Sequence, residues 1–172
     1  MTAAADVVIR PFTADDRPAV IALLDSDPWR RLGYDAADWN RLLTTPLEGR
    51  EGLVLVADGA VSGLALVRRN FLAGDYLELF AVAAGARGRG LGALLLGHLE
   101  SMVFARARNF FVCVSDFNEG ARRFYARHGY VHVGTLPDLL VHGSAELLLR
   151  KRPGPLTTRS RSGATSARPG SR

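Results

Sequence analysis

One stretch of the sequence restricts the fold more than any other: an apolar strand candidate, a loop rich in arginine and glycine, and a helix candidate. The strand candidate, residues 76–82, is apolar on both faces apart from Glu78, which is typical of a central strand covered on each side. The loop, residues 87–92, runs directly into residues 90–107, where leucines recur at helical spacing. We therefore expect this loop at the end of a buried strand and at the start of a helix.

The backbone of this loop is suited to binding an anion. Its N–H groups are those that a helix leaves without partners at its N-terminus, and such groups bind phosphate. Glycines let the backbone approach an anion closely, while Arg87 and Arg89 add charge-assisted contacts. The loop predicts a pyrophosphate site; the alternative is a turn that only allows the strand and the helix to pack tightly.

Two other phosphate-binding motifs rich in glycine do not fit. A P-loop ends in Gly-Lys-Ser/Thr, and the only lysine of the chain is Lys151. A dinucleotide fingerprint needs Gly-x-Gly-x-x-Gly in an early strand–helix unit, and neither Gly88 nor Gly90 starts one, because the third glycine is missing. Both classes of nucleotide site are excluded for this loop.

The remaining segments predict further strands and helices. The Asp58-Gly59 pair lies between two apolar runs, residues 53–57 and 61–67, and predicts a β-hairpin. Thr13 is the expected cap of the first helix. Other strands are expected at residues 7–11, 110–114, 130–133 and 146–149, and helices at residues 13–24, 36–43 and 118–128.

Composition indicates one domain and a tail. Apolar residues make up 48% of the 172 residues, enough for one sizeable core, which we assign to residues 1–152. Residues 153–172 hold four arginines and no acid and are rich in Pro, Gly, Ser and Thr, so a disordered tail is predicted. The net charge of +5 therefore belongs largely to the tail, which argues against a specific nucleic-acid partner for the domain.

Other classes of protein are disfavoured by what the sequence contains. Cys113 is the single cysteine and lies in an apolar strand candidate, so we expect a buried core thiol rather than a nucleophile. The four histidines show no spacing typical of metal ligands, and no metal is expected. Neither a secretory leader pattern nor an apolar run of membrane-spanning length is found, so we expect a cytoplasmic protein without a membrane partner.

Two blocks of the sequence together resemble the GNAT superfamily of N-acyltransferases. Residues 79–82, four intervening residues and the loop at 87–92 are similar to its motif A, with the signature Arg/Gln-x-x-Gly-x-Gly/Ala. Residues 118–130 are similar to motif B, in which an Asn opens a helix that ends in an aromatic residue, a Tyr and a Gly-aromatic stop. The resemblance spans roughly residues 7–151. It implies an α/β (α+β) fold with a mixed, mostly antiparallel sheet of about six to seven strands and helices on both faces.

The resemblance implies an N-acetyltransferase that moves an acetyl group from acetyl-coenzyme A to a primary amine by direct attack in a ternary complex. The amide of Val82 would face the thioester oxygen, and Tyr125 would protonate the departing thiolate. Packing in the core is the competing role of Tyr125. Asn118 would cap its helix, contact the pantetheine arm, or do both. The implied cofactor-binding residues are Phe80, Ala81, Val82, Arg87, Gly88, Arg89, Gly90, Leu91, Gly92, Ala93, Asn118 and Tyr125.

Glu78 is the predicted proton acceptor, because an amine is mostly protonated at pH 7 and must lose a proton before it attacks. Strict strand alternation places Glu78 on one face with Phe80 and Val82. The alternatives are an ion pair and a carboxylate at the sheet end, with water as the base.

The acceptor site is expected in residues 25–43, which carry Trp29 and Tyr34; with Glu78 these are the predicted substrate-binding residues. The four aspartates of this segment and its aromatic side chains suit a cationic amine. Alternatively, Arg30 and Arg31 pair with those acids and the tryptophans belong to the core. Weaker acceptor-site candidates precede the last strand: Asp138, His142 and Ser144.

The expected acceptor is a small-molecule amine. A protein N-terminus or lysine is the alternative acceptor, and a non-catalytic module that binds acyl-coenzyme A is the alternative function. The sequence leaves a monomer and a homodimer open.

Overall fold

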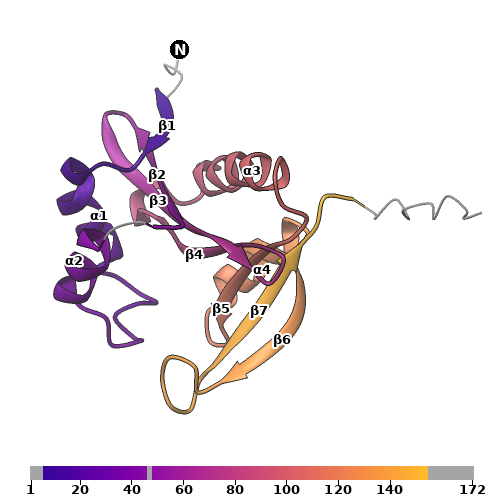
Figure 1. The fold of residues 1–172 in the computed structure, drawn as a ribbon. Coiled ribbons are helices and arrows are strands. Elements are labelled where there is room, and N and C mark those ends of the chain that lie inside the picture. Colours follow the sequence, from indigo (N-terminus) through magenta and orange to yellow (C-terminus); the bar gives the residue numbers. More distant parts are fainter. Residues whose placement is uncertain (1–5, 46–47, 155–172) are drawn as a thin grey trace, which may run out of the picture.

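The computed structural model describes residues 6–45 and 48–154, which form a seven-stranded sheet with helices on both faces (Figure 1). The spatial order of the strands is β1-β2-β3-β4-β5-β7-β6. Only β4 and β5 are parallel; all other neighbours are antiparallel, which confirms the predicted fold class. The strands are β1 (Val7–Pro11), β2 (Arg50–Ala57), β3 (Ala60–Phe71), β4 (Gly74–Val82), β5 (Phe110–Ser115), β6 (Val131–Pro137) and β7 (Ala145–Lys151).

The helices divide between the two faces of the sheet because the strands alternate apolar side chains between them. In β2, Leu53 and Leu55 join the core cluster under α3 and α4, whereas Val54 joins the cluster under α1 and α2. The helical elements are η1 (Ala14–Asp16), α1 (Arg17–Leu24), α2 (Ala36–Thr44), η2 (Ala84–Ala86), α3 (Leu91–Phe104) and α4 (Glu119–Arg127).

Local sequence signals account for several element ends. Asp58 and Gly59 both have positive φ, 53° and 78°, as the predicted hairpin turn requires. Asp35 caps α2 by accepting hydrogen bonds from the N–H groups of Ala37 and Asp38. These polar residues fix where the chain turns, while the apolar pattern fixes which face is buried.

The sheet opens between β4 and β5. These two strands pair only where residues 75–77 face residues 110–112, after which β4 continues alone on that side as far as Val82. On its other edge, β5 pairs with β7 along its whole length, from Phe110 to Ser115. Within the described residues, the β5-facing edge of residues 78–82 therefore has no strand partner, and its backbone groups are available to a ligand.

A β-bulge interrupts β4 at Glu78. Leu66 pairs with Leu79 and Val67 pairs with Leu77, so Glu78 is the extra residue on its strand. Leu77 and Phe80 consequently contribute to the same cluster, under α3 and α4. The predicted alternation, with Glu78 on the face of Phe80 and Val82, is wrong because a bulge shifts the side-chain period by one residue.

Some predicted bounds differ from the observed ones. β3 and β6 extend beyond residues 67 and 133, and α3 ends at Phe104 rather than at residue 107. Of the predicted tail, residues 155–172 lie outside the described part of the chain. None of the described helices is both long enough and apolar enough to cross a membrane.

Candidate active site

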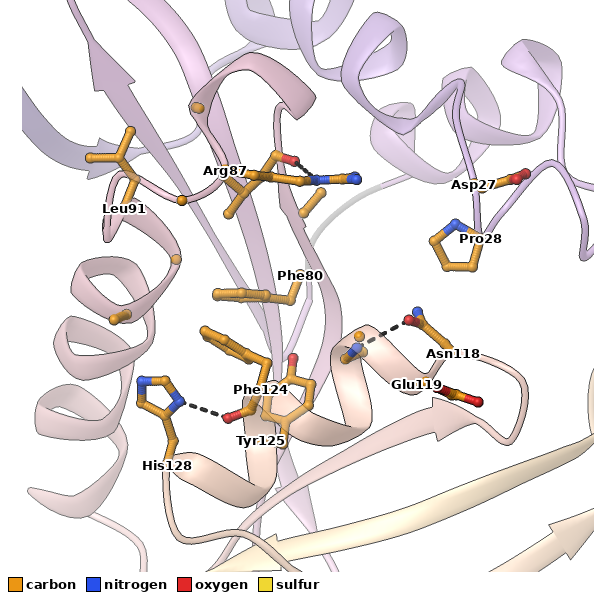
Figure 2. A pocket seen from close by; sticks show the side chains of 18 of the residues that line it. Asp27, Pro28, Phe80, Arg87, Leu91, Asn118, Glu119, Phe124, Tyr125 and His128 are labelled. Carbon is orange, nitrogen blue, oxygen red and sulfur yellow. Dashed lines mark hydrogen bonds between the residues drawn. The ribbon is translucent and has the colours of Figure 1, made fainter.

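The opening between β4 and β5 leads into a cleft of about 1010 Å³ (Figure 2). Its walls come from the end of β4, the loop before α3 and the first turn of that helix, the whole length of α4 and the segment 27–31. The predicted cofactor-binding residues that line it are Phe80, Ala81, Val82, Arg87, Gly88, Gly90, Leu91, Gly92, Ala93, Asn118 and Tyr125.

The loop before α3 has the conformation of an anion site. Gly88 and Gly90 have φ values of 77° and 78°, in the left-handed region that favours glycine. A Cβ added at either position would meet no heavy atom within 4 Å, so space is open in front of this backbone. Gly90 is the N-cap of α3, which places the first, unpaired N–H groups of that helix at the cleft.

The two arginines of this loop point in different directions. Arg87 lines the cleft, and its Nε donates a hydrogen bond to the carbonyl of Val82 at 3.3 Å. In Figure 2 its guanidinium extends towards the wall that carries Asp27. Arg89 does not line the cleft; it forms an ion pair with Asp58 at 2.9 Å, so the structure separates it from the other predicted cofactor residues.

The opposite wall is held by Asn118 and by aromatic stacking. The Asn118 Oδ1 accepts a hydrogen bond from the N–H of Ala121 at 3.1 Å, which confirms the predicted capping of α4. Phe80 of β4 stacks on Phe124 of α4, with 5.8 Å between ring centroids. Figure 2 shows Phe80 between the Arg87 side of the cleft and the aromatic residues of α4.

Tyr125 lies where two cavities meet. It is buried, and burial raises the pKa of its phenol well above the usual value, so the hydroxyl keeps its proton at neutral pH. Its ring packs against Phe80 and Tyr130. The residue belongs to the core and also lines both cavities, so the two roles predicted for it are compatible in position.

A contact that the sequence did not indicate crosses the cleft. The guanidinium of Arg31 lies 3.9 Å from the centroid of the Phe117 ring, in a cation–π contact. Arg31 belongs to the segment between α1 and α2, and Phe117 to the segment between β5 and α4. Both residues line the cleft, so this contact joins its two walls.

A second cavity of about 670 Å³ lies on the α2 side of the opening. Trp29, Tyr34 and Glu78, the predicted substrate-binding residues, all line it. Trp29, Phe80, Asn118 and Tyr125 also line the first cleft, so the two spaces are neighbours. The structure thus brings together the predicted cofactor and acceptor residues from four distant parts of the sequence.

Glu78 is engaged in ion pairs. Its Oε1 accepts a hydrogen bond from Arg68 at 2.8 Å, and its Oε2 lies 3.8 Å from Nη1 of Arg50. The side chain is 19% exposed, and it lines the second cavity. The alternative of an ion pair is therefore what the structure shows, and its cations come from β2 and β3.

Most charges of residues 25–43 are neutralised locally. Arg30 binds Asp25 at 2.8 Å, and Arg41 pairs with Asp38. Trp39 is buried and stacks with Tyr34 at 4.9 Å between ring centroids. For these residues the structure agrees with the alternative of local ion pairs and a core tryptophan, although Trp39 also lines the second cavity together with Trp29 and Tyr34.

The second cavity has polar residues that sequence reasoning missed. Tyr76, Cys113, Ser115 and Glu146 all line it. Cys113 is only half-buried and lies on the cavity side of β5, so the prediction of a buried core thiol is wrong. Burial still raises the pKa of its thiol, which disfavours the nucleophilic thiolate. A carboxylate at the start of an apolar strand, residues 145–149, was the signal available for Glu146.

The weaker candidates before β7 do not line either cavity. On the exposed β6–β7 loop, Nδ1 of His142 lies 3.3 Å from Oδ1 of Asp138, and Ser144 donates a hydrogen bond to Asp116. Their apolar neighbours Leu139 and Leu140 line the second cavity instead. Within residues 6–45 and 48–154, no group of His, Cys, Asp and Glu side chains gathers in a way that could hold a metal ion.

Comparisons with known proteins agree with this geometry. Residues 15–130 match the family described as the Acetyltransferase (GNAT) family. A mycothiol acetyltransferase of Geodermatophilus obscurus is 36% identical over 85 residues, which are 49% of this chain and 27% of that protein. A blasticidin-S acetyltransferase of Streptomyces morookaense is 37% identical over 82 residues, 44% of this chain and 56% of that protein.

The chain thus spans about a quarter and just over half of these two relatives. Among solved structures, an aminoglycoside 6'-N-acetyltransferase in complex with coenzyme A superposes with a TM-score of 0.69 at 18% identity. The superposition covers 86% of this chain and 99% of that one, and at this identity it shows the shared fold.

Proposed function

The chain belongs to the GNAT acetyltransferase family, and on that premise we propose that it transfers an acetyl group from acetyl-coenzyme A to a primary amine. The observation that carries the proposal is the pair of neighbouring cavities at the opening of the sheet, one beside the glycine loop and one beside Glu78. Two cavities that share Phe80 and Tyr125 suit two substrates that react directly, in a ternary complex.

The first cleft would hold the coenzyme. The left-handed backbone at Gly88 and Gly90, the free N–H groups of α3 and the guanidinium of Arg87 provide donors for the pyrophosphate. The unpaired β4 edge provides backbone groups for the amides of the pantetheine arm. Val82 ends this edge, and we assign its N–H the role of stabilising the negative charge that develops on the thioester oxygen.

Tyr125 would protonate the departing thiolate. A general acid must carry its proton at neutral pH, and burial keeps the Tyr125 phenol protonated. The residue lies at both cavities, which is where a sulfur atom would separate from the new amide. A direct route also agrees with Cys113, whose raised pKa gives no activated thiol for an acyl-cysteine intermediate.

The acceptor would occupy the second cavity. Trp29 and Tyr34 offer aromatic surface there, and Glu78 offers a negative charge. Because one Glu78 oxygen already binds Arg68, we assign Glu78 to binding the acceptor rather than to accepting its proton. A small-molecule amine is supported by the two curated relatives, whose names specify mycothiol and blasticidin S.

A protein N-terminus or lysine is the second acceptor class, and a non-catalytic module that binds acyl-coenzyme A is the second function. The retention of Tyr125 and of carboxylates at the acceptor cavity favours catalysis over mere binding. A cytoplasmic location remains a prediction, and a monomer and a homodimer both remain open.

The first experiment is a calorimetric titration of the full chain with acetyl-coenzyme A, repeated on Gly90→Glu. A glutamate here adds a negative charge at the phosphate donors and strains a position of φ 78°, so affinity should fall by at least about tenfold, or about 1.4 kcal/mol. Gly143→Glu is the matched control, since Gly143 has a φ of 80°, lies on the β6–β7 loop and does not line the cleft. Absence of binding by the folded wild type would refute the proposal; binding would justify a screen of amines.

A further inference from the structure

Glu146 is a buried carboxylate that faces the acceptor cavity. It lies on β7 directly opposite Ser115 of β5, and only 5% of it is exposed. Its strand neighbours Leu147 and Leu149 pack into the cluster under α3 and α4, so alternation turns Glu146 to the other face. Ser115, Tyr125 and Asn118 line the same cavity, which places the carboxylate on the acceptor side of the reaction site proposed above.

No cation balances the charge of this carboxylate. Its Oε1 accepts a hydrogen bond from the Ser115 hydroxyl at 2.6 Å, and within the described residues no basic side chain forms a salt bridge with it. Glu78, in the same cavity, is bound by Arg68 and lies near Arg50. The two carboxylates thus differ in their partners. Glu78 is neutralised by arginines, whereas Glu146 is held by a neutral hydroxyl, which leaves its Oε2 free for a ligand.

The surroundings of Glu146 favour its protonated form. Burial raises the pKa of its carboxyl group, Ser115 opposes this shift by donating to the ionised form, and the charge of Asp116 adds to it. A carboxylate with a raised pKa is matched to taking a proton at neutral pH. The other charged or titratable groups that line the cavity are Tyr76 and Glu78 of β4, Cys113 of β5, Tyr125 of α4, Tyr34 before α2, Asp38 and Arg41 of α2, Arg50 of β2 and Arg68 of β3.

We propose that Glu146 is the group that takes the proton from the acceptor ammonium, a proposal that rests on the function inferred above. The ammonium gives one proton to the free Oε2, and the neutral amine attacks the thioester carbonyl. The C–N bond forms and the C–S bond breaks, and the thiolate takes the proton of Tyr125. The second proton lost by the nitrogen restores Tyr125. The sum is an acetamide, a free thiol and one proton on Glu146, which passes to solvent.

Two small nucleophiles distinguish this role from simple binding. Methylamine is mostly protonated at pH 7 and needs a base, whereas hydroxylamine is largely neutral and does not. Acetyl transfer to each is followed by release of the free coenzyme A thiol between pH 5.5 and 9, for wild type, Glu146→Gln and Glu78→Gln. In Glu146→Gln, kcat/KM for methylamine should fall at least about 100-fold at pH 7, and for hydroxylamine less than about tenfold.

The pH profile separates the two carboxylates. Wild-type kcat/KM for methylamine should rise with pH as Glu146 ionises and then level off, and Glu78→Gln should keep this plateau with a higher KM. Glu146→Gln should instead rise without a plateau up to pH 9, because its rate follows the fraction of methylamine that is already neutral in solution. Ser115→Ala should move the rise to higher pH, because the hydroxyl that stabilises the ionised form is gone. If Glu146 had only a structural role, Glu146→Gln should lower kcat/KM equally for both nucleophiles and leave the shape of the pH profile unchanged.

The proposal is wrong if Glu146→Gln retains the plateau at high pH, or if Glu78→Gln is the variant that loses it. Thermal unfolding and titration with acetyl-coenzyme A accompany each variant, and both should match wild type, since Glu146 does not line the coenzyme cleft. Failure of wild type to bind acetyl-coenzyme A would refute the acetyltransferase function itself, which is a separate result.

Discussion

Tyr125 is a core residue to which we also assign a part in the proposed reaction. Its ring packs among Phe80, Phe124 and Tyr130, while its position opens onto both cavities. The hydroxyl is therefore the only part of the side chain that the chemistry needs. Removing it should leave the packing intact and alter the reaction.

We expect Tyr125→Phe to lower kcat by about 10²- to 10³-fold, because the thiolate must then leave without a positioned acid. The Kd for acetyl-coenzyme A should stay within about threefold, and thermal unfolding should show an intact fold. Steady-state kinetics and calorimetry measure these quantities. An unchanged kcat would show that water or another group protonates the thiolate.

Cys113 offers a single chemical reporter for the acceptor cavity. Because it is the only cysteine of the chain and its thiol pKa is raised by burial, alkylation by iodoacetamide should be slow at pH 7 and accelerate as the pH rises. The attached group should block the cavity and abolish acetyl transfer while acetyl-coenzyme A still binds. Mass spectrometry, activity and titration test this together, and Cys113→Ala is the control that should resist the reagent. Full activity of the alkylated protein would argue against this cavity as the acceptor site.

At the scale of the elements, the position of β4 could be predicted from the sequence, but its irregular pairing could not. Its apolar letters identify a buried central strand, and the glycine loop after it identifies the following helix start. The bulge at Glu78 has no comparable signal, because an extra residue in a ladder depends on the register that the neighbouring strand imposes. The ion pair with Arg50 and Arg68 was hidden for the same reason: pairing brings these residues together across three strands.

The start of α1 is tied to β1 through a buried carboxylate. Arg10 of β1 donates two hydrogen bonds to Asp16, at 2.8 and 2.7 Å, and the N–H of Thr13 donates a third at 2.8 Å. The Arg10 hydrogen bonds, aided by those from Thr13, hold the pKa of Asp16 well below its usual value. Thr13 was expected to cap this helix, but the capping interaction runs chiefly from the Asp16 side chain back to its backbone.

A depressed carboxyl pKa stabilises the fold above the unfolded-state value, and the contribution is lost as the pH falls through the lower folded-state value. Asp16→Asn should therefore lower the free energy of unfolding by about 1–3 kcal/mol at pH 7. Between about pH 5 and pH 2 the difference from wild type should shrink, as the wild-type carboxylate becomes protonated. Urea denaturation across this range measures the effect; a constant difference would rule out ionisation of Asp16 as its source.

At the scale of the whole molecule, the site depends on the core that carries α3. Leu95 is completely buried between α3 and the sheet, whereas its neighbour Leu94 is 50% exposed. Leu95→Ala should lower the free energy of unfolding by about 2–5 kcal/mol, because it opens a cavity beneath the helix whose first turn forms the proposed phosphate site. Leu94→Ala should change it by no more than about 0.5 kcal/mol. Equal effects in denaturant titrations would contradict this assignment of the core.

The fold and the cleft that we propose for the coenzyme were accessible from the sequence, because short motifs at residues 76–93 and 118–130 define them locally. The acceptor side was not. Three residues of the second cavity come from strands whose sequences are typical of a buried core: Glu146, Ser115 and Cys113. They line an open cavity only because β4 diverges from β5. The contact of Arg31 with Phe117 likewise joins two loops with no sequence signal linking them.

That divergence also bears on how the two proposed substrates would reach each other. Because the gap lies between a cleft beside α3 and α4 and a cavity beneath α2 with largely different linings, we expect donor and acceptor to enter from different sides. Neither molecule would then seal the other inside. Free coenzyme A should compete with the donor thioester and not with the acceptor.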